Sequence, residues 1–322
     1  MRFKINWCFK LFIFIILFFI MQKESFSRQP SVAGQFYPAQ PTELKTTIKS
    51  YFDKIKDLPQ PEGTLLGLIS PHAGYIFSGQ VAAYSYKFLS QYKFDNPIII
   101  LIGQSHYFHL SNAVLYSRDS FLTPLGEVKI EKKFIDILLE KKELFSEQET
   151  PHLPEHSLEV QIPFLQYVYS NNFTIVPILV SRFDYEKSYR IASIIAETIK
   201  NYSTKRKIII VCSTDMSHYP KYDDAVKIDS QAIELLKKYD PKKYFEELPK
   251  LERTKIANLH CVFCGDTAVG ITLIATKLLG GDKVLVLKYA NSGDVELYGD
   301  KSRVVGYVSA AFVKSVSTKE GQ

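Results

Sequence analysis

The chain has 322 residues, of which 46% are hydrophobic and 23% are charged, and its formal net charge is +6. This balance is that of a globular protein and excludes a mainly disordered chain. The length allows one large domain or two domains of average size.

The first 27 residues have the layout of a secretory signal peptide. A positively charged start precedes an unbroken apolar run over 11–21, and small residues follow at Ser25 and Ser27. The run is shorter than the roughly 20 residues of a spanning helix, so we expect export to the periplasm or the extracellular space. An uncleaved membrane anchor, or a cytoplasmic protein with a misassigned start, are the alternatives. Leader removal takes +3 of the +6 and leaves +3, which gives no electrostatic basis for nucleic-acid binding.

After an introductory segment at 31–41, an amphipathic helix is predicted over 42–55. Further along the chain, apolar runs of strand length alternate with segments that have the periodicity of a helix. The predicted strands are 65–70, 97–103, 174–179, 207–212, 283–289 and 304–312, and the predicted helices are 79–89, 157–169, 185–200, 225–238 and 266–279. Short β-branched runs between helices indicate a largely parallel sheet covered on both faces. The last two strands, around a polar turn at 291–294, are candidates for antiparallel edge strands.

These elements predict an α/β fold, specifically a single α/β/α sandwich domain. We place this domain at 28–316, after the leader at 1–27 and before a polar C-terminal tail at 317–322. No internal repeat and no long linker argues for a second domain.

Three of the predicted strands are followed within a few residues by a histidine. These histidines are His72, His106 and His218. Ligands of open parallel sheets bind at the carboxyl ends of the strands, so we expect the three imidazoles to meet at one edge. Imidazole is the commonest nitrogen ligand of transition metals and the usual general base near neutral pH. One such histidine alone would be read as a structural loop residue, whereas the set favours a metal site.

Three cysteines remain after the leader, and an odd number does not make a disulfide framework. Cys264 stands directly before the predicted helix at 266–279, where the helix dipole favours the thiolate, which is the form that binds metal. Cys212 lies inside a strand and is expected to be a small buried hydrophobe. Cys261 is either a bystander or a redox partner of Cys264.

His156 stands at the start of the predicted helix at 157–169. The neighbouring Glu155 and Glu159 are accounted for as favourable charges near the beginning of that helix. An imidazole close to a metal-bound substrate would serve as a proton shuttle, so His156 is a candidate for that catalytic role.

The same role is open to His218, whose imidazole Asp215 could orient. From the residues alone, the third metal ligand beside His72 and His106 remains open among Asp215, His218 and Cys264. The other histidines, His109, His152 and His260, lack the strand-end context and are expected to be surface or packing residues.

Six motifs occur in the order seen in the Memo family, whose bacterial and archaeal members are called AmmeMemoRadiSam system protein B. They are SVAGQFYP at 31–38, PHAGY at 71–75, GQSH at 103–106, EHSLE at 155–159, STDMSH at 213–218 and CG at 264–265. The resemblance runs from residue 31 to residue 312. It implies a fold similar to that of the class III extradiol dioxygenases of the LigB type. Memo relatives often have a second histidine after GxSH, where this chain has Tyr107, and they generally look cytosolic.

The resemblance also implies a metal pocket of two histidines and a cysteine, which fall on His72, His106 and Cys264. The other pocket residues of the family fall on His156, Asp215 and His218, which we take as the catalytic candidates. The metal would be iron or copper, with zinc as an alternative. Fold similarity does not transfer activity.

Two function classes follow. The first is a metal-dependent redox or dioxygenase-like enzyme acting on an unknown small molecule or peptide. The second is a non-catalytic protein that binds a metal or a peptide as a scaffold. The family association further implies AMMECR-type and radical SAM proteins as partners, and a membrane contact only through an uncleaved N-terminus.

Overall fold

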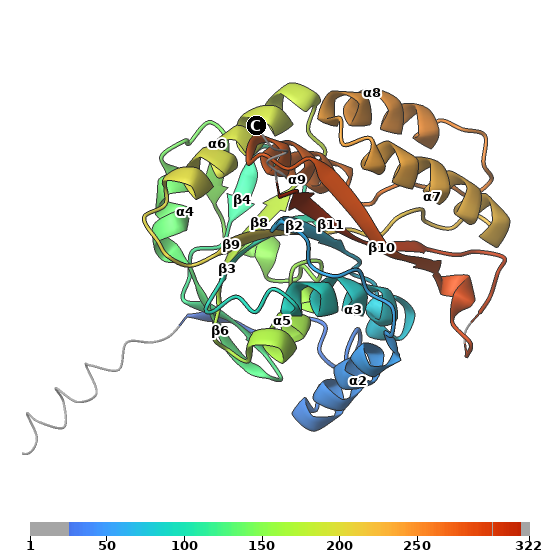
Figure 1. The fold of residues 1–322 in the computed structure, drawn as a ribbon, viewed down its shortest axis with the longest axis horizontal. Coiled ribbons are helices and arrows are strands. Elements are labelled where there is room, and N and C mark those ends of the chain that lie inside the picture. Colours follow the sequence, from blue (N-terminus) through green and yellow to red (C-terminus); the bar gives the residue numbers. More distant parts are fainter. Residues whose placement is uncertain (1–25, 298, 317–322) are drawn as a thin grey trace, which may run out of the picture.

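The computed structural model describes residues 26–297 and 299–316. All of the predicted leader except its last two residues therefore lies outside the described residues, as does the predicted tail at 317–322. Figure 1 shows one large twisted sheet with helices packed on both of its faces. Within the described ranges, no helix combines the length and the apolar character that crossing a membrane requires.

The centre of the sheet is parallel and buried. Its neighbouring strands, in order, are β8 (Thr174–Val180), β3 (Ile98–Gln104), β9 (Ile208–Ser213) and β2 (Thr64–Ser70), and each adjacent pair is parallel. Every side chain of β3 from Ile98 to Ile102 is fully buried. Strands that are covered on both faces need apolar residues at every position, which explains the nearly continuous apolar runs of the sequence.

Beyond β2 the sheet continues as an antiparallel pair, as predicted. β11 (Gly306–Lys314) pairs antiparallel with β2, and β10 (Lys283–Asn291) pairs antiparallel with β11 at the edge. The polar turn forms the 3₁₀ helix η3 (Ser292–Asp294), which Asn291 begins with a capping box. The side chains of Asn291 and Asp294 thereby satisfy main-chain N–H groups that the short turn leaves unpaired.

The opposite end of the sheet consists of strands that the sequence did not predict. They are β6 (Gly126–Ile130), β5 (Ser120–Thr123), β1 (Ser27–Arg28), β4 (Ala113–Leu115) and β7 (Phe145–Glu147). Each has between two and five residues. A strand this short does not establish a period of two in the sequence. β1 pairs with β5, so the first strand includes Ser27, the last residue of the predicted leader.

Helices cover both faces, which confirms the α/β/α arrangement. One layer contains α2 (Pro41–Lys54), α3 (Tyr75–Ser90) and α5 (Ile162–Tyr169), and the other contains α4 (Lys132–Leu139), α6 (Tyr185–Asn201), α7 (Tyr222–Lys237), α8 (Pro241–Glu252) and α9 (Asp266–Leu278). Of these, α4 and α8 were not predicted. The predicted helix at 157–169 is divided into the 3₁₀ helix η2 (Glu159–Gln161) and α5. The loops that follow the carboxyl ends of β2, β3 and β9 form the candidate site, and Ser70, His72 and Ser213 at these ends are buried.

Candidate metal centre

The carboxyl ends of three adjacent parallel strands carry the predicted site residues. His72 follows β2 by two residues, His106 follows β3 by two residues, and the loop after β9 carries Asp215 and His218. Because β3, β9 and β2 are direct neighbours in the sheet, these loops begin side by side. The predicted convergence of His72 and His106 at one edge is confirmed.

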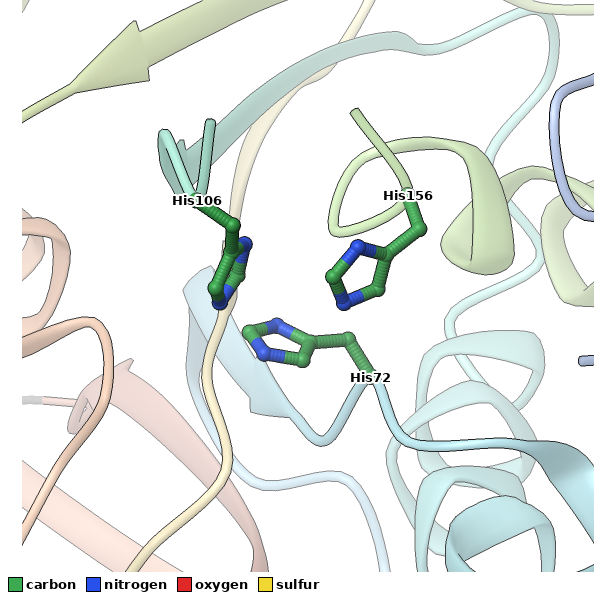
Figure 2. Close-up of side chains that lie close together, drawn as sticks. All are labelled: His72, His106 and His156. Atoms are coloured by element: carbon green, nitrogen blue, oxygen red, sulfur yellow. The ribbon is translucent and has the colours of Figure 1, made fainter. Parts of the chain in front are cut away.

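Three imidazoles come together at this edge. One ring nitrogen each of His72, His106 and His156 lies within 4.8 Å of the other two, in the arrangement that Figure 2 shows. The ring centroids are 5.1 Å apart for His72 and His106 and 4.6 Å apart for His106 and His156. His156 comes from the loop that joins the 3₁₀ helices η1 (Thr150–His152) and η2. It therefore belongs to the cluster itself.

The hydrogen bonds of Ser213 determine which nitrogen of His72 carries the proton. The Ser213 hydroxyl donates to the Ser157 carbonyl at 2.6 Å and accepts from the Gln161 side-chain amide at 2.9 Å. Its single proton is thus used, so it can only accept from Nδ1 of His72, which lies 3.0 Å away. Nε2 of His72 is left with its lone pair, as a metal ligand requires.

Glu155 fixes His106 in the same way. Its carboxylate accepts one hydrogen bond from the His106 main-chain N–H at 2.7 Å and one from Nδ1 at 2.9 Å. Burial disfavours the charged form of Glu155, but the hydrogen bond and charge of His106 outweigh burial and lower the pKa of Glu155 to about 2. The carboxylate is therefore ionised, and Nε2 of His106 is directed away from it. This role of Glu155 could not be recognised in the sequence, because a glutamate near a helix start already has an ordinary explanation.

His156 is the member of the cluster that contacts the N-terminal segment. Its ring contacts that of Phe36, with centroids 4.9 Å apart, and Nδ1 lies 3.4 Å from Oε1 of Glu155. Within the part of the chain that the structure describes, this buried Nδ1 has no hydrogen-bond partner. Burial, followed by the neighbouring His72, lowers the pKa of His156 to about 4. The imidazole is neutral at physiological pH, which is the form that ligates metal.

Cys264 touches the cluster at His72. Its Sγ lies 3.2 Å from Nε2 of His72 and accepts a hydrogen bond from the Asp215 main-chain N–H at 3.2 Å. Because the proton of His72 is on Nδ1, the thiol proton of Cys264 points toward Nε2. The expectation that the start of α9 favours the thiolate is wrong, since burial and then the charge of Asp215 raise the pKa of Cys264 well above its usual value. Cys261 and Cys264 are both free thiols in the described ranges.

Asp215 organises the loop after β2. Its Oδ1 accepts hydrogen bonds from the main-chain N–H groups of His72 at 2.8 Å and Ala73 at 3.3 Å, and burial raises its pKa. Its Oδ2 lies 4.0 Å from Nε2 of His218. That nitrogen is buried and is unpartnered among residues 26–297 and 299–316. His218 thus lies next to Asp215, outside the group of three imidazoles, and burial lowers its pKa.

The donor set has a clear chemical preference. His72 and His156 have lowered pKa values, and burial is the first cause for both. Burial lowers the pKa of His106 too, but the hydrogen bond and charge of Glu155 outweigh burial and raise it, so an ion would displace a proton from this imidazole. Imidazoles, with a thiol beside them, suit zinc, copper and iron, whereas magnesium and calcium prefer carboxylate and carbonyl oxygens. The cluster is therefore compatible with a transition metal ion, and the described residues fit that group.

Comparison with known proteins identifies the family. Residues 28–311 match the family model described as "Memo-like protein". The chain is 38% identical to a MEMO1 family protein of Methanopyrus kandleri over 88% of this chain and 98% of the relative, and 37% identical to one of Saccharolobus solfataricus over 88% and 99%. An uncharacterized Escherichia coli protein of known structure superposes with a TM-score of 0.48 at 10% identity, covering 76% of this chain and 100% of its own. The chain belongs to the Memo family.

Proposed function

We propose that this protein is a metal-dependent redox enzyme whose ion is held by His72, His106 and His156. The observation that carries the proposal is the convergence of the three ring nitrogens within 4.8 Å. The protons on Nδ1 of His72 and His106 are committed to Ser213 and Glu155, so Nε2 is the ligand atom of each, and at His106 the ion would replace the Nε2 proton that Glu155 favours. Preorganised imidazoles of this kind are typical of metal sites, where hydrogen bonds to the second nitrogen fix the tautomer.

We further propose Cys264 as an additional ligand on the side of His72. Its Sγ is close enough to Nε2 of His72 for both atoms to bind one ion, and an ion would replace the thiol proton that lies between them. A thiolate ligand is soft and favours copper or iron, with zinc as the redox-inactive alternative. When bound, iron or copper supplies electron transfer to or from the substrate or dioxygen.

The protein's own contribution would be to orient ligands and to move protons. His218 can accept a proton at Nε2, since burial keeps this imidazole neutral and the nitrogen is unpartnered in the described structure. The carboxylate of Asp215, 4.0 Å away, would stabilise the resulting imidazolium. We assign His218 as the proton-transferring residue and Asp215 as its partner.

We also propose a location and partners for this protein. Export of the mature chain would place the site in the periplasm or outside the cell. AMMECR-type and radical SAM proteins would act in the same system as this chain.

Elemental analysis of anaerobically purified protein tests the metal site. We expect close to one equivalent of iron or copper in the wild type and in His109→Ala, and none in His106→Ala. His109 is a suitable control because it is an exposed histidine on the same loop as His106. A wild type that retains no transition metal would contradict the site. A wild type that retains metal but consumes no oxygen with any candidate substrate would favour the scaffold alternative.

A further inference from the structure

A buried arginine at the start of the described chain is joined to the loop that carries His156. The side chain of Arg28 is fully buried, and so is that of its ion-pair partner, Glu159, with Nη1 and Oε2 2.7 Å apart. The other guanidinium hydrogen bonds go to main-chain carbonyls. Nε donates to His152 at 2.6 Å, and Nη2 donates to Leu153 at 3.2 Å and to Glu155 at 2.7 Å.

With a further contact from Nη1 to the Gln29 carbonyl at 3.3 Å, every N–H group of the guanidinium has an acceptor. Burial of a guanidinium is costly unless all of its donors are paired. The pairing of all five N–H groups satisfies this requirement for Arg28. A lysine, with three donors on one nitrogen, cannot span the same set of acceptors.

Glu159 completes the connection with the segment that follows Arg28. Its carboxylate accepts hydrogen bonds from the main-chain N–H groups of Ser31 at 2.8 Å and Val32 at 3.1 Å, and from the Tyr37 hydroxyl at 2.6 Å. Residues 28–37 are therefore held against the loop at 152–159 by one ion pair and a ring of hydrogen bonds. We call this assembly the N-terminal clasp.

The clasp acts on the metal cluster at two points. The Glu155 carbonyl that Arg28 binds belongs to the peptide group joining Glu155 to His156, so one hydrogen bond holds the residue that orients His106 and the residue that supplies the third imidazole. Phe36, within the clasp, packs against the ring of His156. None of the side chains of residues 28–37 supplies an atom to the group of three nitrogens.

We propose that Arg28 is a positioning residue of the metal centre, which sets metal affinity by fixing the peptide between Glu155 and His156. The proposal rests on the metal-binding function proposed above. It also makes the N-terminal segment, far from His72 and His106 in the sequence, a structural part of the site.

Arg28→Lys tests the proposal, and Arg206→Lys is the matched control. Arg206 also pairs with a glutamate, Glu131, at 2.6 Å and also binds main-chain carbonyls, but it does so at the amino end of the central strands, where β3 begins. It is the less buried of the two, with its side chain 24% exposed. Full-length proteins are stripped of metal and titrated with Co²⁺ against a chelator, with the visible cobalt spectrum and the Tm of the apo form recorded.

We expect Arg28→Lys to weaken Co²⁺ binding at least tenfold and to change the visible spectrum, as residues that support metal ligands typically do. Arg206→Lys should change the affinity less than twofold, although both variants lower the Tm. Wild-type affinity in Arg28→Lys would overturn the positioning role while leaving the metal site intact. No Co²⁺ binding by the wild type would overturn both.

A double-mutant cycle of Arg28→Lys with His156→Gln tests whether Arg28 affects metal affinity through the loop that carries His156. If Arg28 acts through this loop, the double variant loses less affinity than the product of the two single losses. Strictly multiplicative losses of affinity would contradict an action of Arg28 through this loop.

Should Arg28→Lys not fold, Tyr37→Phe replaces it as the test variant, because the Tyr37 substitution deletes one hydrogen bond to Glu159. Reduced affinity at an unchanged Tm then supports the clasp, and unchanged affinity overturns it.

Discussion

Glu155 holds His106 by two hydrogen bonds at once, one to its main-chain N–H and one to Nδ1 of its ring. A third hydrogen bond to the same carboxylate comes from the main-chain N–H of Ser157 at 2.9 Å. This single buried side chain therefore fixes the tautomer and orientation of His106 and the turn that contains His156. It links the loop after β3 to the loop before η2.

Glu155→Gln should weaken metal binding by about 10- to 100-fold, the usual range for residues that orient a ligand histidine. The amide has one acceptor oxygen for three donors, so at least one main-chain N–H loses its partner. Competition titration with Co²⁺ measures the effect. Glu149→Gln is the control, since Glu149 is paired with Arg118 on the surface of the same region. Equal affinities in the two variants would show that the His106 interaction is not needed.

Ser213→Ala should lower metal affinity by about tenfold, because Nδ1 of His72 and the amide of Gln161 both lose their acceptor. Ser188→Ala serves as the comparison, since the Ser188 hydroxyl is buried in α6 without a hydrogen-bond partner among the described residues. It should leave metal affinity at the wild-type value. Titration of both apo proteins with Co²⁺ measures their metal affinities. Wild-type affinity in Ser213→Ala would argue against the assigned tautomer of His72.

Cys264→Ser tests whether the thiol is a ligand. If Sγ binds the ion, the Co²⁺ or Cu²⁺ form of the wild type shows a near-ultraviolet charge-transfer band that the variant lacks, and metal affinity falls. Cys261→Ser is the control, because the thiol of Cys261 donates to the Met216 carbonyl, whereas that of Cys264 lies against His72. A wild-type spectrum without that band would remove Cys264 from the ligand set but would leave the three imidazoles as proposed.

The buried Asp229 predicts a pH dependence of stability. Its carboxylate accepts hydrogen bonds from the main-chain N–H and hydroxyl of Ser217 and from the hydroxyl of Tyr289. Burial nevertheless raises its pKa from 3.8 to about 7. Asp229 therefore binds a proton more tightly in the folded state than in the unfolded state. The stabilisation of the fold by protonated Asp229 is fully present below about pH 4 and is lost as the pH rises toward 7.

Between these values the free energy of unfolding should fall with rising pH by at most about 1.4 kcal/mol per unit from this group. Asp229→Asn removes the titration, so its stability relative to the wild type should increase from pH 4 to pH 7. Urea denaturation at several pH values measures this difference. Parallel stability profiles of the two proteins would refute the assignment to Asp229.

The mature N-terminus is predicted to lie at or before Arg28. The predicted leader ends at Ser27, and the clasp needs Arg28 to fill the buried site beside Glu159. N-terminal sequencing of the protein recovered from its natural location measures the position directly. A stable, metal-loaded mature chain that begins after Arg28 would contradict both the cleavage position and the role of the clasp.

The long parallel strands were predictable because burial on both faces forces continuous apolar runs, as in β3 and β9. The arrangement of His72 and His106 followed from this, since parallel strands end at a common edge. The short strands β4 to β7 could not be predicted, because they pair through long-range contacts and carry no periodic signal of their own.

The site was only partly predictable for a related reason. His156 was named as a pocket residue from its motif, but Glu155 and Arg28 act through contacts between segments far apart in the sequence, and no local pattern encodes such contacts. The raised pKa of Cys264 shows a second limit. Position at a helix start favours the thiolate, but burial depends on the whole fold and outweighs it.

The transition metal ion that we propose binds among His72, His106 and His156. An anomalous-difference map, recorded at the absorption edge of the metal present in crystals of the purified protein, tests this proposal most directly. We predict a single strong peak within bonding distance, about 2.0–2.2 Å, of Nε2 of His72 and Nε2 of His106. A peak elsewhere in the molecule, or none in protein supplied with iron, copper and zinc, would contradict the account.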